Sequence, residues 1–564
     1  MYINKQREDG LLIMKRILAG FMSVLLAAAL VACTAPAADP VPAAQTQQPA
    51  AQAAQAAQDA TAVEDERVSI HIFGSRSPVS PEDWNTKQLV QEWSEAVNVH
   101  FEWELVTTGF QDAKSLRLAS GDWPDVFMTV TDDEIIRYGT EGVFIPLNDL
   151  KERYAPNLMS LYTQYPDTRA FMTAPDGNKY TFPFHSIGPW GGINRLMVIN
   201  TTWLSNLGLD MPTNLHEFRD VLRAFRDGDV NQDGYQTEVI PLSWAGALNG
   251  FHPMGWAFAP DFISASFQSP LPSGNVHVQI ADGQVYFIPV TEEYRNWIRF
   301  MGELFAEGLL DPVGFTQGTD TYSAKLNTDP FSVGVAAVWD IGDSFHDPDA
   351  VYHYDFLPPL YGLNGERPVV QFNLGHGGRQ MWAITRNAAN PEAIVRAVDW
   401  IFHCPSISVQ HLEGPFHDRL LPCACGLDTA WGTGTPPEGM DNTTWRNTVS
   451  LFGATPAWLN VEMYGRYLHL HFTDRKVEFM NTTMAPYKDP EPMPPFFLTL
   501  EETQIRAEVL TDINEFVNRM GAEMVINNNV DEIWDRYVED LGRMGYQRIV
   551  DVQQAAVDRT LARR

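Results

Sequence analysis

The feature that most constrains the fold of this chain is an alternation of strand-like and helix-like stretches that begins at Val68. The segment VSIHIFG (68–74) alternates as an opening β-strand does. The stretch 86–106 then passes from a helical pattern into a second strand, and 115–130 reads as a helix, a glycine turn and a short buried strand. Alternation at this spacing favours an α/β fold whose sheet is covered by helices on both faces.

Further along the chain, helical periodicity is strong and the signals at the helix ends can be named. TEEYRNWIRFMGELFAEGLLDP predicts a helix that Thr291 caps and Gly308 closes. In NPEAIVRAVDWIF, Asn390 is a candidate cap and Pro391 suits the first helical position. The tail from 531 to 564 predicts two more helices. One face of the first helix is expected in the core: Tyr294, Trp297, Ile298, Met301, Leu304 and Phe305.

The N-terminus has the three-part layout of an export signal. In KRILAGFMSVLLAAALVAC (15–33), two cations precede an apolar run that is too short for a comfortable membrane span. The ending LVAC resembles a bacterial lipobox, which would make Cys33 the lipidated first residue of the mature protein. The alternative is an uncleaved anchor helix. Either way, the folded part is expected to be exported and held on the outer face of the cytoplasmic membrane.

The segment 34–66 that follows is almost entirely small and polar. It is rich in Ala, Gln and Pro and has almost no large apolar residue. Such a segment cannot bury enough surface to offset its chain entropy, so we expect a disordered tether between a lipid and a globular body.

The net charge excludes one class of partner. The chain carries 71 Asp and Glu against 39 Lys and Arg, a formal charge of -32. A field of this sign repels phosphate backbones and anionic lipid surfaces, so nucleic acid is not expected as a partner. Aromatic residues make up 12% of the chain, which is compatible with core packing and with ring stacking on a ligand.

Five stretches, in this order, resemble the extracellular solute-binding proteins of carbohydrate ABC importers. The likeness is greatest to the large lipoprotein members and to the alginate-oligosaccharide-binding proteins, and it covers nearly everything from residue 67 to residue 564. The stretches are the lipobox that ends at Cys33, LASGDWPDVF, DGQVYFIPVTEEYRNWIRFMGELFAEGLLDP, AITRNAANPEAIVRAVDWIF and DEIWDRYVEDLGRMGYQRIVD.

The resemblance implies a two-lobed α/β fold of the periplasmic-binding-protein type, with a ligand cleft between discontinuous lobes. The chain should cross between the lobes near 185–195, near 376–382 and somewhere in 450–495. The expected parts are a signal peptide over 1–33, a tether over 34–66, a first lobe from 67–187 and 380–455, and a second lobe from 188–379 and 456–564.

The segment GDVNQDGYQTE opens like a calcium loop. Oxygen-bearing side chains fall on the first, third and fifth positions, a glycine permits the turn at the sixth, and a backbone carbonyl is available at the seventh. The bidentate Glu that an EF-hand needs at the twelfth position is replaced by Ile240, so this is no EF-hand. The candidate ligands are Asp229, Asn231, Asp233, Tyr235, Thr237 and Glu238.

The resemblance also indicates how this loop closes. The alginate-binding relatives carry acids at the ninth and tenth positions of a similar loop; Glu238 matches the tenth, whereas Thr237 offers only a weaker hydroxyl at the ninth. The alternative is a solvated turn without metal. Because the loop joins the helical HEFRDVLRAFRD to the apolar VIPLSW, we expect a structural calcium that fixes a helix–strand corner and takes no part in activity.

Candidate ligand-binding residues are tryptophans that stand in loops beside glycine, together with nearby polar groups. Sugar binding needs flat aromatic faces and a few placed polar side chains. The resemblance to maltose-binding relatives favours Trp339 and Trp244 as stacking residues, with Asp340 as a hydroxyl acceptor. For each tryptophan the alternative is ordinary core packing. The other candidates are Trp190, Trp256, His376, Arg379, Asp122 and Trp123.

The segment 403–425 contains three His and three Cys, but the spacing lacks the CxxC pairs typical of zinc sites. An exported protein would more readily pair Cys404 with Cys423 or Cys425 as a disulfide. Free buried thiols and a metal site remain alternatives.

The function expected from the sequence is that of a monomeric binding protein that captures an oligosaccharide and delivers it to the permease subunits of an ABC transporter. An enzyme is not expected, because no GxSxG, HExxH or P-loop motif is present. A peptide-binding or sensory lipoprotein of the same fold is the alternative. The bulk charge disfavours acidic sugars unless Arg195 or Arg379 reverses it locally.

Overall fold

The computed structural model describes residues 67–186, 196–235, 238–246, 260–269, 277–345, 347, 349–370, 378–415, 420–422, 431–433, 437–438, 440, 442–459, 473–494 and 496–562. The part of the chain from Glu66 to Arg564 forms one compact unit. Within the described ranges, no helix combines the length and the apolarity needed to cross a bilayer.

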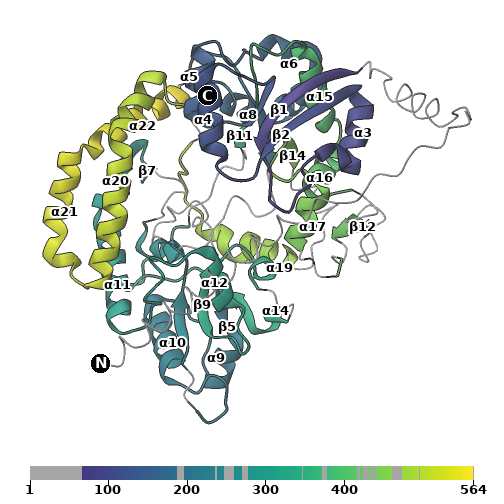
Figure 1. Cartoon of the computed structure of the whole chain (residues 1–564). Coiled ribbons are helices and arrows are strands. Elements are labelled where there is room, and N and C mark those ends of the chain that lie inside the picture. Colours follow the sequence, from purple (N-terminus) through teal and green to yellow (C-terminus); the bar gives the residue numbers. More distant parts are fainter. Residues whose placement is uncertain are drawn as a thin grey trace, which may run out of the picture. The chain divides into compact units, whose positions relative to one another are not determined.

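A six-stranded sheet is built from the first part of the chain and three later strands (Figure 1). Its order is β14-β4-β11-β3-β1-β2, and every neighbouring pair that includes β11 is antiparallel, whereas the other pairs are parallel. The strands are β1 (Val68–Ser75), β2 (Val99–Val106), β3 (Val126–Thr129), β4 (Phe182–Ser186), β11 (Gly378–Ile384) and β14 (Ala457–Leu459).

Alternate side chains of these strands enter two separate cores, one on each face of the sheet. Ile70 and Ile72 belong to one core, and Phe73 belongs to the other. The first core packs on α3 (Gln88–Val97), α7 (Pro156–Gln164) and α15 (Pro391–Ile401), the second on α4 (Phe110–Ser120) and α5 (Asp132–Thr140). The period of two residues in a strand produces this division. The α/β class predicted from the sequence is therefore confirmed.

The remaining short elements of this part of the structure lie between and after these strands in the chain. They are η1 (Trp84–Thr86), α6 (Asn148–Tyr154), α8 (Pro166–Phe171), α16 (Pro405–Glu413), α17 (Asn442–Val449) and the hairpin of β12 (Leu420–Pro422) with β13 (Trp431–Thr433).

A four-stranded sheet of order β10-β5-β9-β6 forms the centre of a third core. In this sheet β9 is parallel to β6, whereas β5 is antiparallel to both β9 and β10. All six residues of β9 are buried, which is typical of a strand covered on both faces. The strands are β5 (Leu196–Asn200), β6 (Ile240–Ser243), β9 (Val333–Val338) and β10 (Tyr354–Phe356).

Helices and a hairpin surround the four-stranded sheet. The hairpin of β7 (Val278–Ala281) and β8 (Gln284–Phe287) turns at Asp282 and Gly283, both with positive φ, as an Asp-Gly turn between twisted strands requires. The other elements are α9 (Thr201–Leu207), α10 (Leu215–Asp227), η3 (Pro260–Phe267), η4 (Ile288–Val290), α11 (Glu292–Ala306), α12 (Thr319–Leu326), α13 (Ile341–Ser344), α14 (Ala350–His353), α19 (Thr473–Glu478), η5 (Phe479–Met484) and η6 (Ala485–Tyr487).

Three connections between the two sheets can be followed from the residues that the structure describes. It leaves β4 at Ser186 and enters β5 at Leu196, and it later runs from β10 in the second sheet to β11 in the first. It leaves the first sheet again after β14, and Met480 of η5 already lies in the core of the second. Because β14 pairs with β4, residues 457–459 belong to the first sheet, whereas the sequence assigned 456–564 to the second lobe.

The C-terminal helices contact elements that pack on each of the two sheets. The 27-residue α20 (Leu500–Ile526) pairs Arg506 with Asp133 of α5, and its later apolar residues enter the core of the second sheet. It is followed by α21 (Val530–Met544) and α22 (Tyr546–Leu561), which Gly545 separates with a φ of 85°. The two helices predicted over 531–564 are confirmed.

Most predicted helix ends agree with the structure. Thr291 accepts a hydrogen bond from the backbone N–H of Tyr294 at 3.2 Å, and the predicted apolar face of α11 is buried, with Phe305 partly so. Gly308 follows with a φ of 71°. Asn390 precedes α15 without capping it through its side chain, so that part of the prediction was wrong, whereas Pro391 takes the first turn as expected.

Candidate ligand-binding site

The candidate site is defined by the ends of the strands. In the six-stranded sheet, β1, β3 and β4 end at the same edge, and β11 begins there because it is antiparallel to its neighbours. We name this edge, marked by Ser75, Thr129, Ser186 and Gly378, the first carboxyl edge. Ligands of open α/β sheets bind outside the carboxyl ends of strands.

The four-stranded sheet has a corresponding edge. Strands β6 and β9 end there at Ser243 and Val338, and β5 begins there at Leu196, which pairs with Val338. We name this the second carboxyl edge. The chain crosses from Ser186 on the first edge to Leu196 on the second, so both edges adjoin the same connection.

Trp339 and Asp340 follow β9 directly at the second carboxyl edge. Trp339 is half-buried, and the Lys476 ammonium lies 3.7 Å from the centre of its ring. Lys476 also donates a hydrogen bond to the Trp339 carbonyl oxygen at 2.6 Å. The Asp340 side chain is buried. One side of the indole is thus occupied by a cation, and the role predicted for this pair remains a prediction.

Trp244 follows β6 at the same edge, but it lies in the core. The residue is 0% exposed, its indole N–H donates to the carbonyl of Gly246 at 2.9 Å, and Phe315 packs edge-on at 5.0 Å. A Cβ on Gly314 would lie 2.7 Å from the indole, so the backbone itself presses on this ring. A fully covered indole offers no face to a sugar, so this placement contradicts the stacking role predicted for Trp244.

Arg379 lies at the first carboxyl edge with its donors engaged inside the protein. Its guanidinium forms a bidentate pair with Asp132 at 3.0 and 2.5 Å and donates to the carbonyls of Phe171 and Phe496. The rings of Phe171 and Phe497 lie 4.7 and 3.5 Å from it. The residue is 5% exposed. Such an arginine joins elements of the fold, and its charge is already compensated by the aspartate.

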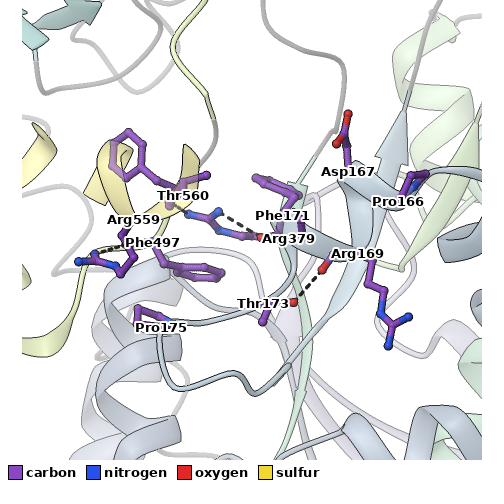
Figure 2. A pocket seen from close by; sticks show the side chains of 12 residues that line it. Pro166, Asp167, Arg169, Phe171, Thr173, Pro175, Arg379, Phe497, Arg559 and Thr560 are labelled. Carbon is purple, nitrogen blue, oxygen red and sulfur yellow. Dashed lines mark hydrogen bonds between the residues drawn. The ribbon is translucent and has the colours of Figure 1, made fainter. Parts of the chain in front are cut away.

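A pocket of about 310 Å³ opens beside this arginine, and we name it the Arg379 pocket. Figure 2 shows Arg379 and Arg559 among phenylalanine side chains of α8 and of the segment before α20. Arg559 pairs with Glu502 at 2.7 Å and donates to the Phe497 carbonyl at 3.0 Å. The lining residues are Pro166, Asp167, Arg169, Ala170, Phe171, Thr173, Pro175, Arg379, Phe496, Phe497, Arg559 and Thr560.

Asp122 and Trp123 lie at the opposite edge of the six-stranded sheet. They precede β3 and so stand where the strands begin, and the Arg386 guanidinium lies 4.6 Å from the Trp123 ring. The Trp123 indole donates to the carbonyl of Leu118 at 3.2 Å. This position does not bring the pair to either carboxyl edge, so their predicted place beside the cleft was wrong in this structure.

Four further candidates lie outside the described residues. They are Trp190, Trp256 and His376 of the ligand set and Thr237 of the metal set.

A second pocket at the first carboxyl edge was missed from the sequence. It has a volume of about 150 Å³, and we name it the β1-edge pocket. The only local signal was the serine-rich SRSPVS that begins at the last residue of the first strand, since the other wall comes from residues far along the chain. Its lining residues are Ser75, Arg76, Ser77, Ser80, Trp84, Asn447, Ser450, Leu451, Phe452, Gly453 and Ala454.

Lys87 joins the two walls of this pocket. Its ammonium donates to the carbonyls of Asn447 at 2.9 Å and Ser450 at 2.6 Å, and it lies 5.2 Å from the centre of the Trp84 ring. The residue is 4% exposed, and burial lowers its pKa to about 7.

The candidate calcium loop has a folded turn with inward-facing carboxylates. Asp229 accepts hydrogen bonds from the backbone N–H groups of Asp233 at 3.2 Å and Gly234 at 2.8 Å, and Gly234 has a φ of 82°. Oxygen donors of this kind suit a hard cation. Among the residues that the structure describes, no three His, Cys, Asp or Glu side chains gather as a metal site. The predicted placement between α10 and β6 is confirmed.

The His- and Cys-containing segment is only partly described. Cys404 carries a free thiol 3.0 Å from the Ser406 hydroxyl, and Cys423 and Cys425 lie outside the described residues. His411 is buried, with the Trp93 ring centre 5.0 Å from its own. This histidine is part of the core beneath the six-stranded sheet.

Comparison with known proteins identifies the family to which this architecture belongs. The chain matches the family model of the bacterial extracellular solute-binding proteins over residues 81–402. The fructooligosaccharide ABC transporter substrate-binding protein FusA of Streptococcus pneumoniae is 28% identical over 504 residues, which are 87% of this chain and 90% of FusA.

Solved structures agree with this assignment. FusA in complex with kestose has a TM-score of 0.75 at 27% identity and covers 88% of this chain and 100% of its own. An EF-hand mutant of FusA in complex with fructo-nystose gives the same values. An extracellular solute-binding protein from Bifidobacterium longum subsp. infantis shares the fold, with a TM-score of 0.77 at 21% identity, 89% of this chain and 100% of its own. Two sheets joined at their carboxyl edges, in a chain that matches the family model over more than half its length, show that this protein belongs to the bacterial extracellular solute-binding proteins.

Proposed function

We propose that this protein captures an oligosaccharide at the two carboxyl edges and delivers it to the permease of an ABC transporter. The observation that carries the proposal is the similarity to FusA, a fructooligosaccharide-binding protein, along 87% of this chain. The kestose complex of FusA has the same fold along its whole length, which makes fructooligosaccharides the first ligands to test.

Side chains at the carboxyl edges support a neutral sugar over an acidic one. Trp339 at the second edge offers a half-buried indole, and serine and asparagine groups line a pocket at the first edge. Arg379, which the sequence offered as a cation for an acidic sugar, is compensated by Asp132. Trp339 and Asp340 are therefore the ligand contacts that we propose, with Trp190, Trp256 and His376 as further candidates in the connecting segments.

The N-terminal segment supplies the proposed attachment. Cys33 is the lipidated residue, and 34–66 tethers the folded part to the outer face of the cytoplasmic membrane. Residues 67–187 and 380–455, extended to β14, make up one lobe, and the remainder makes up the other. The protein acts as a monomer beside the permease subunits.

Calcium is a structural cofactor in this proposal. Asp229, Asn231, Asp233, the Tyr235 carbonyl and Glu238 would hold the ion, with Thr237 completing the set, and the ion's role would be to fix the corner between α10 and β6. The loop already turns as such a site requires, with Asp229 accepting backbone N–H groups of the turn. The EF-hand mutant of FusA indicates that a related loop exists in a similar protein.

The test is a binding titration of the chain from residue 34 to 564, followed by calorimetry and by tryptophan fluorescence. The panel comprises fructooligosaccharides, other neutral oligosaccharides, alginate oligosaccharides and short peptides. Saturable binding of one neutral glycan class at one site per chain is the expected result. Binding of peptides alone would refute the proposal and support the peptide-binding or sensory alternative.

A further inference from the structure

The β1-edge pocket lies where a ligand of the two carboxyl edges would reach. Ser75 is the last residue of β1, and Arg76 and Ser77 continue from the strand into the pocket wall. The backbone N–H of Arg76 still donates to the Val106 carbonyl at 3.0 Å, which fixes the start of this wall to the adjacent strand. The wall is therefore an extension of the sheet and has a defined position.

The size of the pocket suits a single ring. Its volume is about 150 Å³. A protein cavity of about 150 Å³ holds one benzene molecule, so a space of this size accepts one six-membered ring or a smaller one. A whole oligosaccharide does not fit; one sugar ring would enter with part of its hydroxyl rim outside the pocket.

The chemistry of the lining suits hydroxyl groups. Ser75, Ser77 and Asn447 bring side chains that can donate and accept hydrogen bonds. Phe452 contributes a ring that is 47% exposed, with the Arg446 guanidinium 3.8 Å from its centre. A neutral sugar presents the same combination, because its ring has an apolar C–H side and a rim of hydroxyls.

The cations of this pocket are engaged with its own walls. Arg76 donates to the carbonyl of Ser80 at 2.8 Å, and Lys87 donates to the carbonyls of Asn447 and Ser450. The Arg76 bond closes the wall that continues from β1, and the Lys87 bonds fix the wall at 447–454 to the start of α3. Walls fixed before binding lower the ordering cost of a ligand.

We propose that the β1-edge pocket is a subsite for one neutral sugar ring of the captured oligosaccharide, with Phe452 against the C–H side and Ser77 and Asn447 against the hydroxyls. This inference rests on the function proposed above and assigns a place to one residue of its ligand.

The test is to fill the pocket. In Ser77→Phe, a phenyl group would occupy the space proposed for the sugar ring. Calorimetry with kestose and with the next longer fructooligosaccharide, on the chain from residue 34 to 564, should show at least a tenfold loss of affinity for whichever of them the wild type binds better. Ser160→Phe, the same change at an exposed position of α7, is the matched control and should bind as the wild type does.

A second variant protects the test against misfolding. Asn447→Ala removes one amide without adding bulk, and we expect a several-fold weaker binding with an unchanged melting temperature. Wild-type affinity in both Ser77→Phe and Asn447→Ala, with the wild type itself binding sugar, would overturn this subsite and leave the proposed function intact. A wild-type protein that binds no glycan of the panel would overturn both.

Discussion

The Arg379 pocket and the β1-edge pocket adjoin the same edge of the six-stranded sheet, and they differ in how their polar side chains are used. The Arg379 pocket is the larger, at about 310 Å³ against 150 Å³. Two of its arginines, Arg379 and Arg559, are paired with Asp132 and Glu502, and their bonds to carbonyls join separate elements. The β1-edge pocket is lined mainly by serine, asparagine and aromatic side chains, and Arg76 and Lys87 beside it donate to backbone carbonyls.

We interpret the Arg379 pocket as a place where elements of the fold are joined, and the β1-edge pocket as a place where a ligand can bind. In the Arg379 pocket, the guanidinium binds α5, α8 and the segment before α20 at once, so its hydrogen-bonding capacity is used within the protein. In the β1-edge pocket, hydroxyl and amide groups line the space together with Arg76, whose guanidinium donates to the Ser80 carbonyl. The volume of a pocket is therefore a weaker guide to a ligand than the state of its polar groups.

The largest effect should come from breaking the arginine of the larger pocket. Arg379→Met removes a buried guanidinium that donates to the Asp132 carboxylate and to the Phe171 and Phe496 carbonyls. Each hydrogen bond to a charged group contributes about 1.5–3 kcal/mol, so the loss of several should cost about 3–5 kcal/mol. We expect a loss of this size in the free energy of unfolding, measured by denaturant titration. Arg137→Met, which breaks an exposed pair with Glu141, should cost less than about 0.5 kcal/mol. Equal losses of stability in the two variants would contradict the role of Arg379 in joining α5, α8 and the segment before α20.

The stability contribution of Lys87, beside the β1-edge pocket, should depend on pH. The pKa of Lys87 is lowered to about 7 by burial, whereas an unfolded lysine keeps its proton to about pH 10.4, so between these values the unfolded state binds more protons and stability rises with pH. The wild type should therefore gain about 2–3 kcal/mol relative to Lys87→Met between pH 7 and pH 9. The difference between wild type and Arg379→Met should stay flat over this range, because arginine remains charged. If the stability difference between the wild type and Lys87→Met were also independent of pH, the Lys87 amine would not be desolvated in the folded protein.

At the second carboxyl edge, Trp339→Ala should weaken glycan binding by about tenfold, equivalent to about 1.4 kcal/mol of lost contact. Calorimetry measures the affinity, and the melting temperature should stay close to that of the wild type because Trp339 is only half-buried. Trp123→Ala, at the other end of the first sheet, is the control and should bind normally. A loss in Trp123→Ala with none in Trp339→Ala would reverse the assignment of the edges.

The smallest effect concerns the calcium loop, which lies away from both pockets. Free calcium at ten times its dissociation constant stabilises the folded state by about 1.4 kcal/mol, which corresponds to about 1–2 °C in melting temperature for a folded unit of this length. EDTA should lower the melting temperature by about this amount in the wild type and should have no effect in Asp229→Asn. Glycan affinity should be the same in both. A melting curve indifferent to EDTA and to added calcium would eliminate the site.

The comparison also shows what the sequence could predict. The strand at 68–75, the helix capped by Thr291 and the two terminal helices were predictable because periodicity and end signals are local. Trp244 and Trp339 each follow a parallel strand of one sheet, and nothing local distinguishes them. Gly314 and Phe315 pack against Trp244 and bury it, whereas Trp339 is half-buried. The contacts that bury Trp244 come from the tertiary fold and leave no signal in the local sequence.

The β1-edge pocket was hidden from the sequence for the same reason. One wall follows the first strand, and the other lies at 447–454, with Lys87 bonded to a carbonyl 363 positions away. The roles of Asp122 and Trp123 failed differently, because the loop was recognised but the sheet edge on which it stands was not. A strand pattern does not by itself say which of its ends faces a ligand.

The central claim is that an oligosaccharide binds at the two carboxyl edges, and a crystal structure with ligand tests it most directly. Crystals of the chain from residue 34 to 564 would be grown with the glycan that binds most tightly in the titration, kestose being the first choice. We predict density for the sugar against Trp339, with one ring in the β1-edge pocket beside Ser77 and Phe452. A glycan bound away from both edges, or seated in the Arg379 pocket, would contradict the account.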